Sequence, residues 1–167
     1  MHSSAFQLTK EKLDPEDYLK EDDLDFEDGM PISIADYIQD SNREEDITWF
    51  LQDLQHGTAE GWVYHEEAQS ITFTKEFITS YFQRNYKRFK ELASQITLEE
   101  FAYDDYSETI GGFPATEMKQ LIDDRYEFYV YNGYFKTFDS FVRSLNAEFK
   151  EKESVTYYFG GTLDYHF

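Results

Sequence analysis

The side chains of this sequence best suited to chemistry are carboxylates that recur at helical spacing. In the stretch LEEFAYDDYSE (98–108), Glu100, Asp104 and Glu108 follow one another in steps of four. Side chains one helical turn apart lie about 6 Å from each other, a separation comparable to that of neighbouring phosphates along a DNA strand. Such a row presents negative charge to a cationic surface. We name this group the helical acidic cluster; its members are Glu99, Glu100, Tyr103, Asp104, Asp105, Tyr106 and Glu108.

A second acidic group lies in the stretch LDPEDYLKEDDLDFEDG (13–29), where Lys20 is the one basic residue. Apolar side chains interrupt the acids at intervals, at Leu13, Tyr18, Leu19, Leu24 and Phe26. The stretch is therefore either a disordered acidic tail or a segment held to the core by these side chains, and the recurring apolar residues favour the second interpretation. We name its partner-binding candidates the N-terminal acidic group: Asp22, Asp23, Asp25, Glu27 and Asp28.

The two acidic groups differ in what binding costs them. A helix is preorganised, whereas a mobile segment loses about 1 to 2 kcal/mol of conformational free energy for each residue that becomes ordered. We therefore expect the helical acidic cluster to dominate affinity. We expect the N-terminal acidic group to act mainly on the association rate, through electrostatic steering.

Motifs for catalysis, metal binding and phosphate binding are incomplete. The glycine pair at 111–112 lacks the lysine and the glycine pattern of a phosphate-binding loop. If Gly29 were the sixth residue of an EF-hand loop, Leu24 would occupy the first ligand position. His65 has no second histidine one helical turn away, as a zincin requires. We expect no cofactor, no metal site and no catalytic residues; a carboxylate site assembled from distant positions is the enzymatic alternative.

Composition places the chain among acidic globular proteins. Its 167 residues carry 35 acidic and 15 basic side chains, a net charge of −20, and no cysteine. A chain of this length buries about 70% of the surface that its unfolded form exposes, so it needs no disulfide to fold. The charge repels phosphate backbones and anionic lipid. No apolar run approaches the roughly 18 residues of a membrane span, and residues 1–12 lack the apolar segment of a secretory signal.

The acidic groups must be positioned by helices and hairpins that alternate in blocks. The longest expected helix, Thr74–Ile96, carries an apolar stripe in steps of three and four and is the one basic stretch of the chain. We expect an α+β fold in which several helices surround this long central helix, with antiparallel β-hairpins. Residues 1–29 form an acidic N-terminal arm, loose over residues 1–12, and residues 30–167 form a single α+β domain.

Local signals place the shorter elements. Caps and apolar spacing predict helices over residues 34–40, 43–55, 98–108 and 114–124, and one more that begins after Asp139. Strand patterns predict a hairpin of residues 61–65 with 70–74, one around Asn132-Gly133 with positive φ at both positions, and one around Gly160-Gly161.

In size, acidity, lack of cysteine and richness in Tyr and Phe, the chain resembles the acidic inhibitors encoded by phages and mobile elements, the DNA-mimic antirestriction and anti-CRISPR proteins. The resemblance covers composition across the whole chain and does not rest on a motif. It implies an inhibitor that mimics the charge of DNA and binds the basic nucleic-acid-binding surface of a host-defence nuclease in the bacterial cytoplasm. A CRISPR effector's site for the short duplex motif beside its target is one such surface.

Two alternatives stay open. An immunity protein or antitoxin that neutralises a basic toxin would also be acidic and aromatic, with Tyr or Trp side chains as anchors. The other alternative is the enzyme with a dispersed carboxylate site. For the inhibitor we expect a basic protein partner and no direct contact with nucleic acid or membrane.

Overall fold

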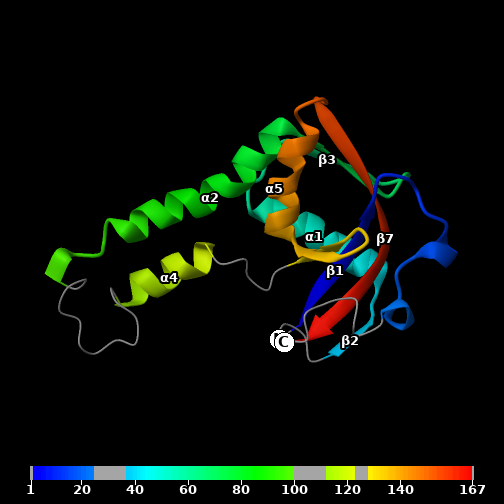
Figure 1. Cartoon of the computed structure of the whole chain (residues 1–167), viewed down its shortest axis with the longest axis horizontal. Coiled ribbons are helices and arrows are strands. Elements are labelled where there is room, and N and C mark those ends of the chain that lie inside the picture. Colours follow the sequence, from blue (N-terminus) through cyan, green and yellow to red (C-terminus); the bar gives the residue numbers. More distant parts are fainter. Residues whose placement is uncertain (1, 25–36, 100–111, 123–127, 167) are drawn as a thin grey trace. The chain divides into compact units, whose positions relative to one another are not determined.

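The computed structural model describes residues 2–24, 37–99, 112–122 and 128–166 of the chain (Figure 1). Within these ranges it has the helices α1 (Arg43–His56), α2 (Lys75–Ala93), α4 (Gly112–Ile122) and α5 (Phe138–Glu148). It has seven strands, β1 (His2–Thr9), β2 (Tyr37–Asp40), β3 (Trp62–His65), β4 (Ser70–Thr74), β5 (Tyr129–Tyr131), β6 (Phe135–Thr137) and β7 (Ser154–His166). All seven belong to one sheet in the order β3-β4-β7-β1-β5-β6, with β2 also paired to β7.

The long strand β7 organises this sheet. One of its sides pairs with β4 up to Tyr158 and with β2 from Leu163 onward, while its other side pairs with β1. Figure 1 shows β7, in red, running through the whole sheet. All of its pairings are antiparallel, and the pairing of β1 with β5 is parallel, so the sheet is mixed.

A bulge interrupts the pairing of β7 with β1, where Gly160 and Gly161 together oppose Gln7. The Gln7 Oε1 atom accepts hydrogen bonds from the backbone nitrogens of Leu19 and Gly161, each at 2.8 Å. A Cβ atom on Gly161 would lie 2.1 Å from the Leu19 carbonyl oxygen, and one on Gly160 would lie 2.1 Å from Gln7 Oε1. The two glycines are therefore required for close approach, and their φ angles are ordinary.

Arg43 occupies the other side of β7 at the same point. Among the described strands, none pairs with residues 159–162 on that side. The Arg43 Nε and Nη2 atoms donate hydrogen bonds to the carbonyl oxygens of Gly160 (2.6 Å) and Phe159 (2.8 Å), and Nη1 donates to Gln69 Oε1 (3.1 Å). The guanidinium also lies 5.0 Å from the ring centroid of Tyr18. Arg43 thus joins α1, β7, the β3–β4 hairpin and the segment around Tyr18.

An aromatic core fills the face of the sheet that α1 and α5 cover. The ring of Phe50 on α1 lies 5.0 Å from that of Phe6 on β1 and 5.0 Å from that of Phe138 on α5. These three side chains are almost completely buried. The 3.6-residue period of α1 places Ile47, Phe50 and Leu54 on this core, as the sequence predicts.

The opposite face of the sheet carries a smaller core. Because successive residues of a strand point to opposite faces, Ala5 lies on this side while Phe6 lies on the other. Leu19, only 6% exposed, packs here with Tyr129, Leu163 and Tyr165. Short 3-10 helices at Pro15–Asp17 and Glu21–Asp23 flank Leu19.

The expectation that residues 1–12 are loose is wrong, because β1 lies between β7 and β5 in the sheet.

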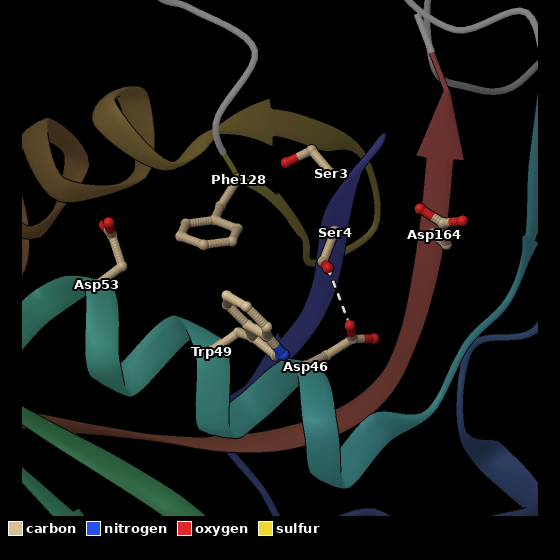
Figure 2. Close-up of a pocket in the computed structure, with 7 residues that line it drawn as sticks. All are labelled: Ser3, Ser4, Asp46, Trp49, Asp53, Phe128 and Asp164. Atoms are coloured by element: carbon tan, nitrogen blue, oxygen red, sulfur yellow. Dashed lines mark hydrogen bonds between the residues drawn. The ribbon is translucent and has the colours of Figure 1, made fainter. Parts of the chain in front are cut away.

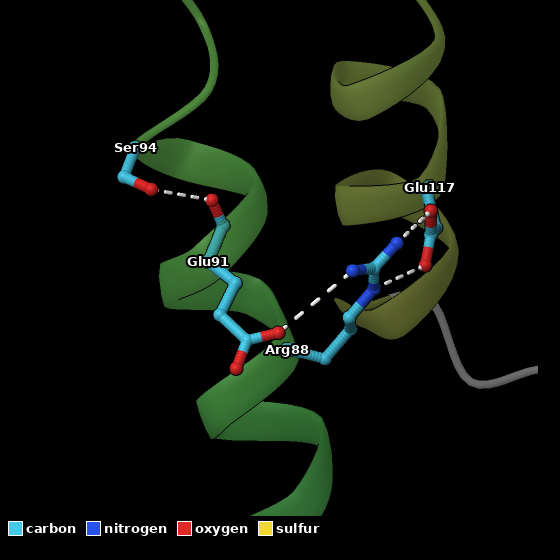
Figure 3. Close-up of polar contacts among 4 residues, drawn as sticks. All are labelled: Arg88, Glu91, Ser94 and Glu117. Atoms are coloured by element: carbon cyan, nitrogen blue, oxygen red, sulfur yellow. Dashed lines mark hydrogen bonds and ion pairs between the residues drawn. The ribbon is translucent and has the colours of Figure 1, made fainter.

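The chain divides into two compact units, residues 1–81 with 126–167 and residues 82–125. We name them the sheet unit and the helical unit. In the sheet unit, Phe77 at the start of α2 is fully buried. In the helical unit, the Arg88 side chain on α2 donates from Nε and Nη2 to the two carboxylate oxygens of Glu117 on α4, at 2.7 and 2.8 Å (Figure 3). Glu91 lies 3.8 Å from Arg88 Nη1.

The expected fold centred on one long helix is wrong. A helix is present over most of Thr74–Ile96, but the structure is an α+β fold centred on the sheet. The apolar stripe of α2 serves two units rather than one core: Phe77 is buried in the sheet unit and Leu92 in the helical unit. Between them, Tyr86 is 64% exposed. An apolar period shows that a helix has a packing face, but it does not show that all of the face packs on one core.

Three hairpin predictions have different outcomes. The hairpin of β3 with β4 is confirmed. A hairpin forms around Asn132-Gly133, but Tyr131 pairs with Phe135, so the loop has three residues and the positive φ, 95°, is at Gly133 and not at Asn132. The hairpin expected at Gly160-Gly161 is wrong, since β7 passes through both glycines without a turn. The glycine pair is predicted to form a turn, but it forms a β-bulge in the structure.

The helix predictions also have different outcomes. The helix expected over residues 43–55 is confirmed as α1, and its Asn42 side chain accepts a hydrogen bond from the backbone nitrogen of Glu45. The helix expected over residues 34–40 is wrong where the structure describes it, because Tyr37–Asp40 is β2. Pairing with the end of β7 outweighs the local capping signal there. Of the helix expected over residues 98–108, Leu98 and Glu99 are helical and the rest lies outside the described residues.

We expect Gly161→Ala to lower the free energy of unfolding by about 1 to 3 kcal/mol, because its Cβ would overlap the Leu19 backbone. Chemical denaturation measures the change. Gly57→Ala is the matched control: Gly57 has a helical φ of −67°, and its Cβ would lie 3.3 Å from the nearest atom, so the change should stay below about 1 kcal/mol. Equal stability of the two variants would show that Leu19 does not pack on Gly161.

The Arg88–Glu117 pair predicts a pH dependence in the helical unit. Hydrogen bonds from Arg88 hold the pKa of the Glu117 carboxyl below its ordinary value. A carboxyl whose pKa is lowered by folding contributes stability above its unfolded pKa, about 4.3 for Glu, and loses it as the pH falls through the lowered value. A carboxyl ¹³C NMR titration should show this low pKa and its return toward ordinary in Arg88→Gln. The exposed neighbour variant Lys87→Gln should leave it low; equal pKa values in both variants would contradict the pairing.

Candidate functional site: an aromatic groove with an acidic rim

A groove of about 600 Å³ in the sheet unit is the best candidate site in the described part of the chain (Figure 2). It lies between α1, the start of β1, the residue before β5 and the end of β7. We name it the Trp49 groove; its lining residues are Ser3, Ser4, Asp46, Trp49, Asp53, Phe128 and Asp164. The lining therefore combines two aromatic rings, three carboxylates and two hydroxyls.

Helix α1 supplies the central part of the groove. Asp46, Trp49 and Asp53 follow one another in steps of three and four, so they share one side of the helix. The helix is fixed by its other side, where Phe50 and its neighbours are buried in the aromatic core. Figure 2 shows Asp46 and Asp53 on either side of Trp49 along α1.

Two aromatic side chains form the apolar part of the groove. The Phe128 ring is held by the core, with its centroid 5.5 Å from that of Phe6 and 5.4 Å from that of Phe50. Trp49 is 65% exposed. Tryptophan is highly buried on average in folded proteins, so a tryptophan exposed on a groove is a feature that folding does not require.

Hydroxyl groups hold the Asp46 carboxylate in place. Ser4 Oγ donates a hydrogen bond to Asp46 Oδ1 at 3.0 Å, drawn in Figure 2, and Ser41 Oγ donates to Asp46 Oδ2. The Ser41 hydroxyl has one hydrogen, which Asp46 receives, so Thr162 must donate in the 2.9 Å contact between the Thr162 and Ser41 hydroxyls. A carboxylate has about four acceptor sites, so Asp46 keeps capacity for a further donor.

Asp164 is oriented in a similar way from the opposite side. It accepts a hydrogen bond at 2.9 Å from Gln39 Nε2 on the neighbouring strand β2. The sheet pairing places Gln39 directly across from Asp164. The carboxylates of the rim are therefore supplied by the helix α1 and the strand β7.

The chemistry that this arrangement supports is recognition of a cation. Aromatic faces attract cations through their quadrupole, and carboxylates accept charge-assisted hydrogen bonds. Among the described lining residues there is no histidine or lysine. The Ser4 hydroxyl donates to the Asp46 carboxylate, which also accepts a hydrogen bond from Ser41. In the described ranges, no group of three or more His, Asp or Glu side chains is placed to hold a metal ion.

Of the sequence-predicted site residues, Asp22, Asp23 and Glu99 are described, and the described lining of the Trp49 groove includes none of them. Asp22 and Asp23 are exposed in the second 3-10 helix, and the Asp23 carboxylate accepts a hydrogen bond from the backbone nitrogen of Lys20. Glu99 is exposed. The remaining predicted residues lie outside the described residues: Asp25, Glu27, Asp28, Glu100, Tyr103, Asp104, Asp105, Tyr106 and Glu108. Both acidic groups stay predictions.

The Trp49 groove was missed by the sequence reasoning, although α1 was predicted correctly. The signal was available in part. The apolar stripe of that helix runs through Ile47, Phe50 and Leu54, and Trp49 falls outside it. A large aromatic residue outside the packing stripe, with acids one turn away on both sides, indicates a binding face. The contributions of β1 and β7 are not visible from the sequence because they depend on the sheet order.

Comparison with known proteins adds no relative: no family model, curated protein or solved structure matches the chain. The structure does bear on one general property. Among the described residues, no helix combines the length and the apolar character that a membrane crossing requires.

Proposed function

We propose that this chain is an inhibitor that binds the basic nucleic-acid-binding surface of a nuclease and excludes its nucleic acid. The observation that carries the proposal is charge. The chain has a net charge of −20, and every acidic residue of the described N-terminal segment, residues 11–23, is exposed. Exposed acids continue at Glu44 and Glu45 on α1 and at Glu66 and Glu67 in the β3–β4 loop.

Electrostatics selects the class of partner. A surface with this excess of negative charge repels phosphate backbones and attracts basic protein surfaces, and complementary charge raises the association rate by steering. Channels that hold nucleic acid are rich in Arg and Lys, because they neutralise phosphates. An acidic protein that is rigid where it makes contact competes with DNA for such a channel with little loss of conformational entropy on binding.

Host-defence nucleases are the proposed targets, in the bacterial cytoplasm. The support is the compositional resemblance to acidic inhibitors of phages and mobile elements, which act on CRISPR effectors and restriction enzymes. The function requires no catalysis, and the groove on α1 offers recognition chemistry. An immunity protein against a nuclease toxin would have the same surface, so the experiment includes that class of target.

The proposal predicts inhibition that weakens with salt. A guide-loaded Cas9-type effector, restriction endonucleases and nuclease toxins are assayed for cleavage of a labelled DNA duplex, with and without the chain. We expect the chain to block at least one host-defence nuclease, and we expect added salt to relieve the block because it screens exposed charges. A mobility shift with the duplex alone should show no binding.

The possible outcomes distinguish the proposed inhibitor from the immunity-protein alternative. Tight binding of the chain itself to duplex DNA, or unchanged cleavage across the panel, would contradict the proposal. Inhibition of the toxins alone would establish the immunity-protein alternative. Against a blocked enzyme, Asp104→Asn with Asp105→Asn should raise the dissociation rate, and Asp22→Asn with Asp23→Asn should lower the association rate.

A further inference from the structure

We propose that the Trp49 groove receives an arginine side chain of the basic partner. The inference rests on the proposed function and adds the contact site and the side chain that it takes. Asp22, Asp23 and Glu99, the described members of the sequence-predicted acidic groups, are not among its lining residues. The groove therefore has its own test.

The groove offers both parts that an arginine requires. Its apolar part is the exposed ring of Trp49 beside Phe128, and its rim is Asp46, Asp53 and Asp164. A guanidinium stacks on an aromatic face and at the same time donates a fork of hydrogen bonds to a carboxylate. Trp49 lies between two carboxylates on the same side of α1, so one cation in the groove meets both types of group (Figure 2).

Arginine fits this site better than lysine does. A lysine ammonium is a compact, strongly hydrated charge, whereas the guanidinium is planar, weakly hydrated and able to contact a carboxylate through two bonds. The fold itself contains a related contact, since the Arg43 guanidinium lies 5.0 Å from the ring centroid of Tyr18 and also donates hydrogen bonds to two backbone carbonyl oxygens. A volume of about 600 Å³ also leaves space for neighbouring residues of the partner.

The groove is preorganised for binding. Ser4 and Ser41 hold the Asp46 carboxylate, and Gln39 holds that of Asp164. Phe128 is fixed by the aromatic core. A charged group that is already oriented loses little conformational freedom when a partner arrives, so more of the interaction energy remains as affinity. Tryptophan and arginine, together with tyrosine, are also the residues enriched among side chains that dominate binding energy at interfaces.

The test uses the full chain labelled with 5-fluorotryptophan. Its two tryptophans, Trp49 and Trp62, give two ¹⁹F resonances, and Trp49→Phe identifies that of Trp49. Hexa-arginine and hexa-lysine peptides are titrated at physiological salt. We expect the Trp49 resonance to shift on addition of hexa-arginine, with a smaller shift for hexa-lysine. The Trp62 resonance should stay in place, because the Trp62 Nε1 atom donates to the Ala59 carbonyl away from the groove lining.

Matched variants separate the groove from general acidity, with affinity measured by calorimetry. Trp49→Ala should weaken hexa-arginine binding about fivefold. Asp53→Asn should weaken it more than Asp14→Asn, which removes the same charge from an exposed position outside the groove. Thermal melting of each variant confirms folding; Trp49→Ala should melt near the wild type because the side chain is exposed.

Each result bears on one claim. A Trp49 resonance that does not move, or equal loss of affinity in Asp53→Asn and Asp14→Asn, would overturn the groove assignment. Inhibition of a nuclease by the wild-type chain could still be observed in that case, and the proposed function would stand. If no nuclease is inhibited while the Trp49 resonance shifts, the groove takes arginine but the proposed function fails.

Discussion

The structure depends on how the middle of β7 is held at the point where it changes partners. Between its pairing with β4 and its pairing with β2, the carbonyl oxygens of Phe159 and Gly160 receive hydrogen bonds from Arg43. On the other side of the strand, Gln7 Oε1 accepts a hydrogen bond from the backbone nitrogen of Gly161. Buried backbone groups without partners are costly, so these two side chains replace the missing strand pairing. Two glycines are needed because side chains there would overlap Gln7 and the N-terminal segment.

The same junction positions the candidate site. Arg43 is the first residue of α1, so its hydrogen bonds to β7 fix the start of the helix that carries Asp46, Trp49 and Asp53. Ser41 extends the junction by joining Thr162 of β7 to the Asp46 carboxylate. The groove therefore adjoins the junction at which α1 is hydrogen-bonded to β7. A rigid acidic site next to an exposed aromatic ring is the arrangement that favours tight binding of a cationic side chain.

Local elements could be predicted from the sequence, and their assembly could not. α1 and the β3–β4 hairpin follow from the Asn42 cap, the apolar period and strand alternation. The role of Gly160-Gly161 was misread, because a glycine pair signals a turn as readily as a bulge, and the choice depends on Gln7, more than 150 residues away. The central place of α2 was misread because its apolar stripe is shared by two units. The groove combines α1 with β1 and β7, so it required the sheet order.

The central claim is that the Trp49 groove is a specific site for an arginine side chain, in addition to the general attraction between the acidic surface and a basic partner. The most direct measurement is a ¹H–¹⁵N NMR titration of the full chain with hexa-arginine, read as a map of shifted backbone amides. The largest shifts should fall on residues 46–53, on Ser3 and Ser4, and on Phe128 and Asp164, and they should saturate at a common affinity. Shifts that are largest over residues 11–23, or that are uniform over all exposed acids without saturation, would contradict the claim.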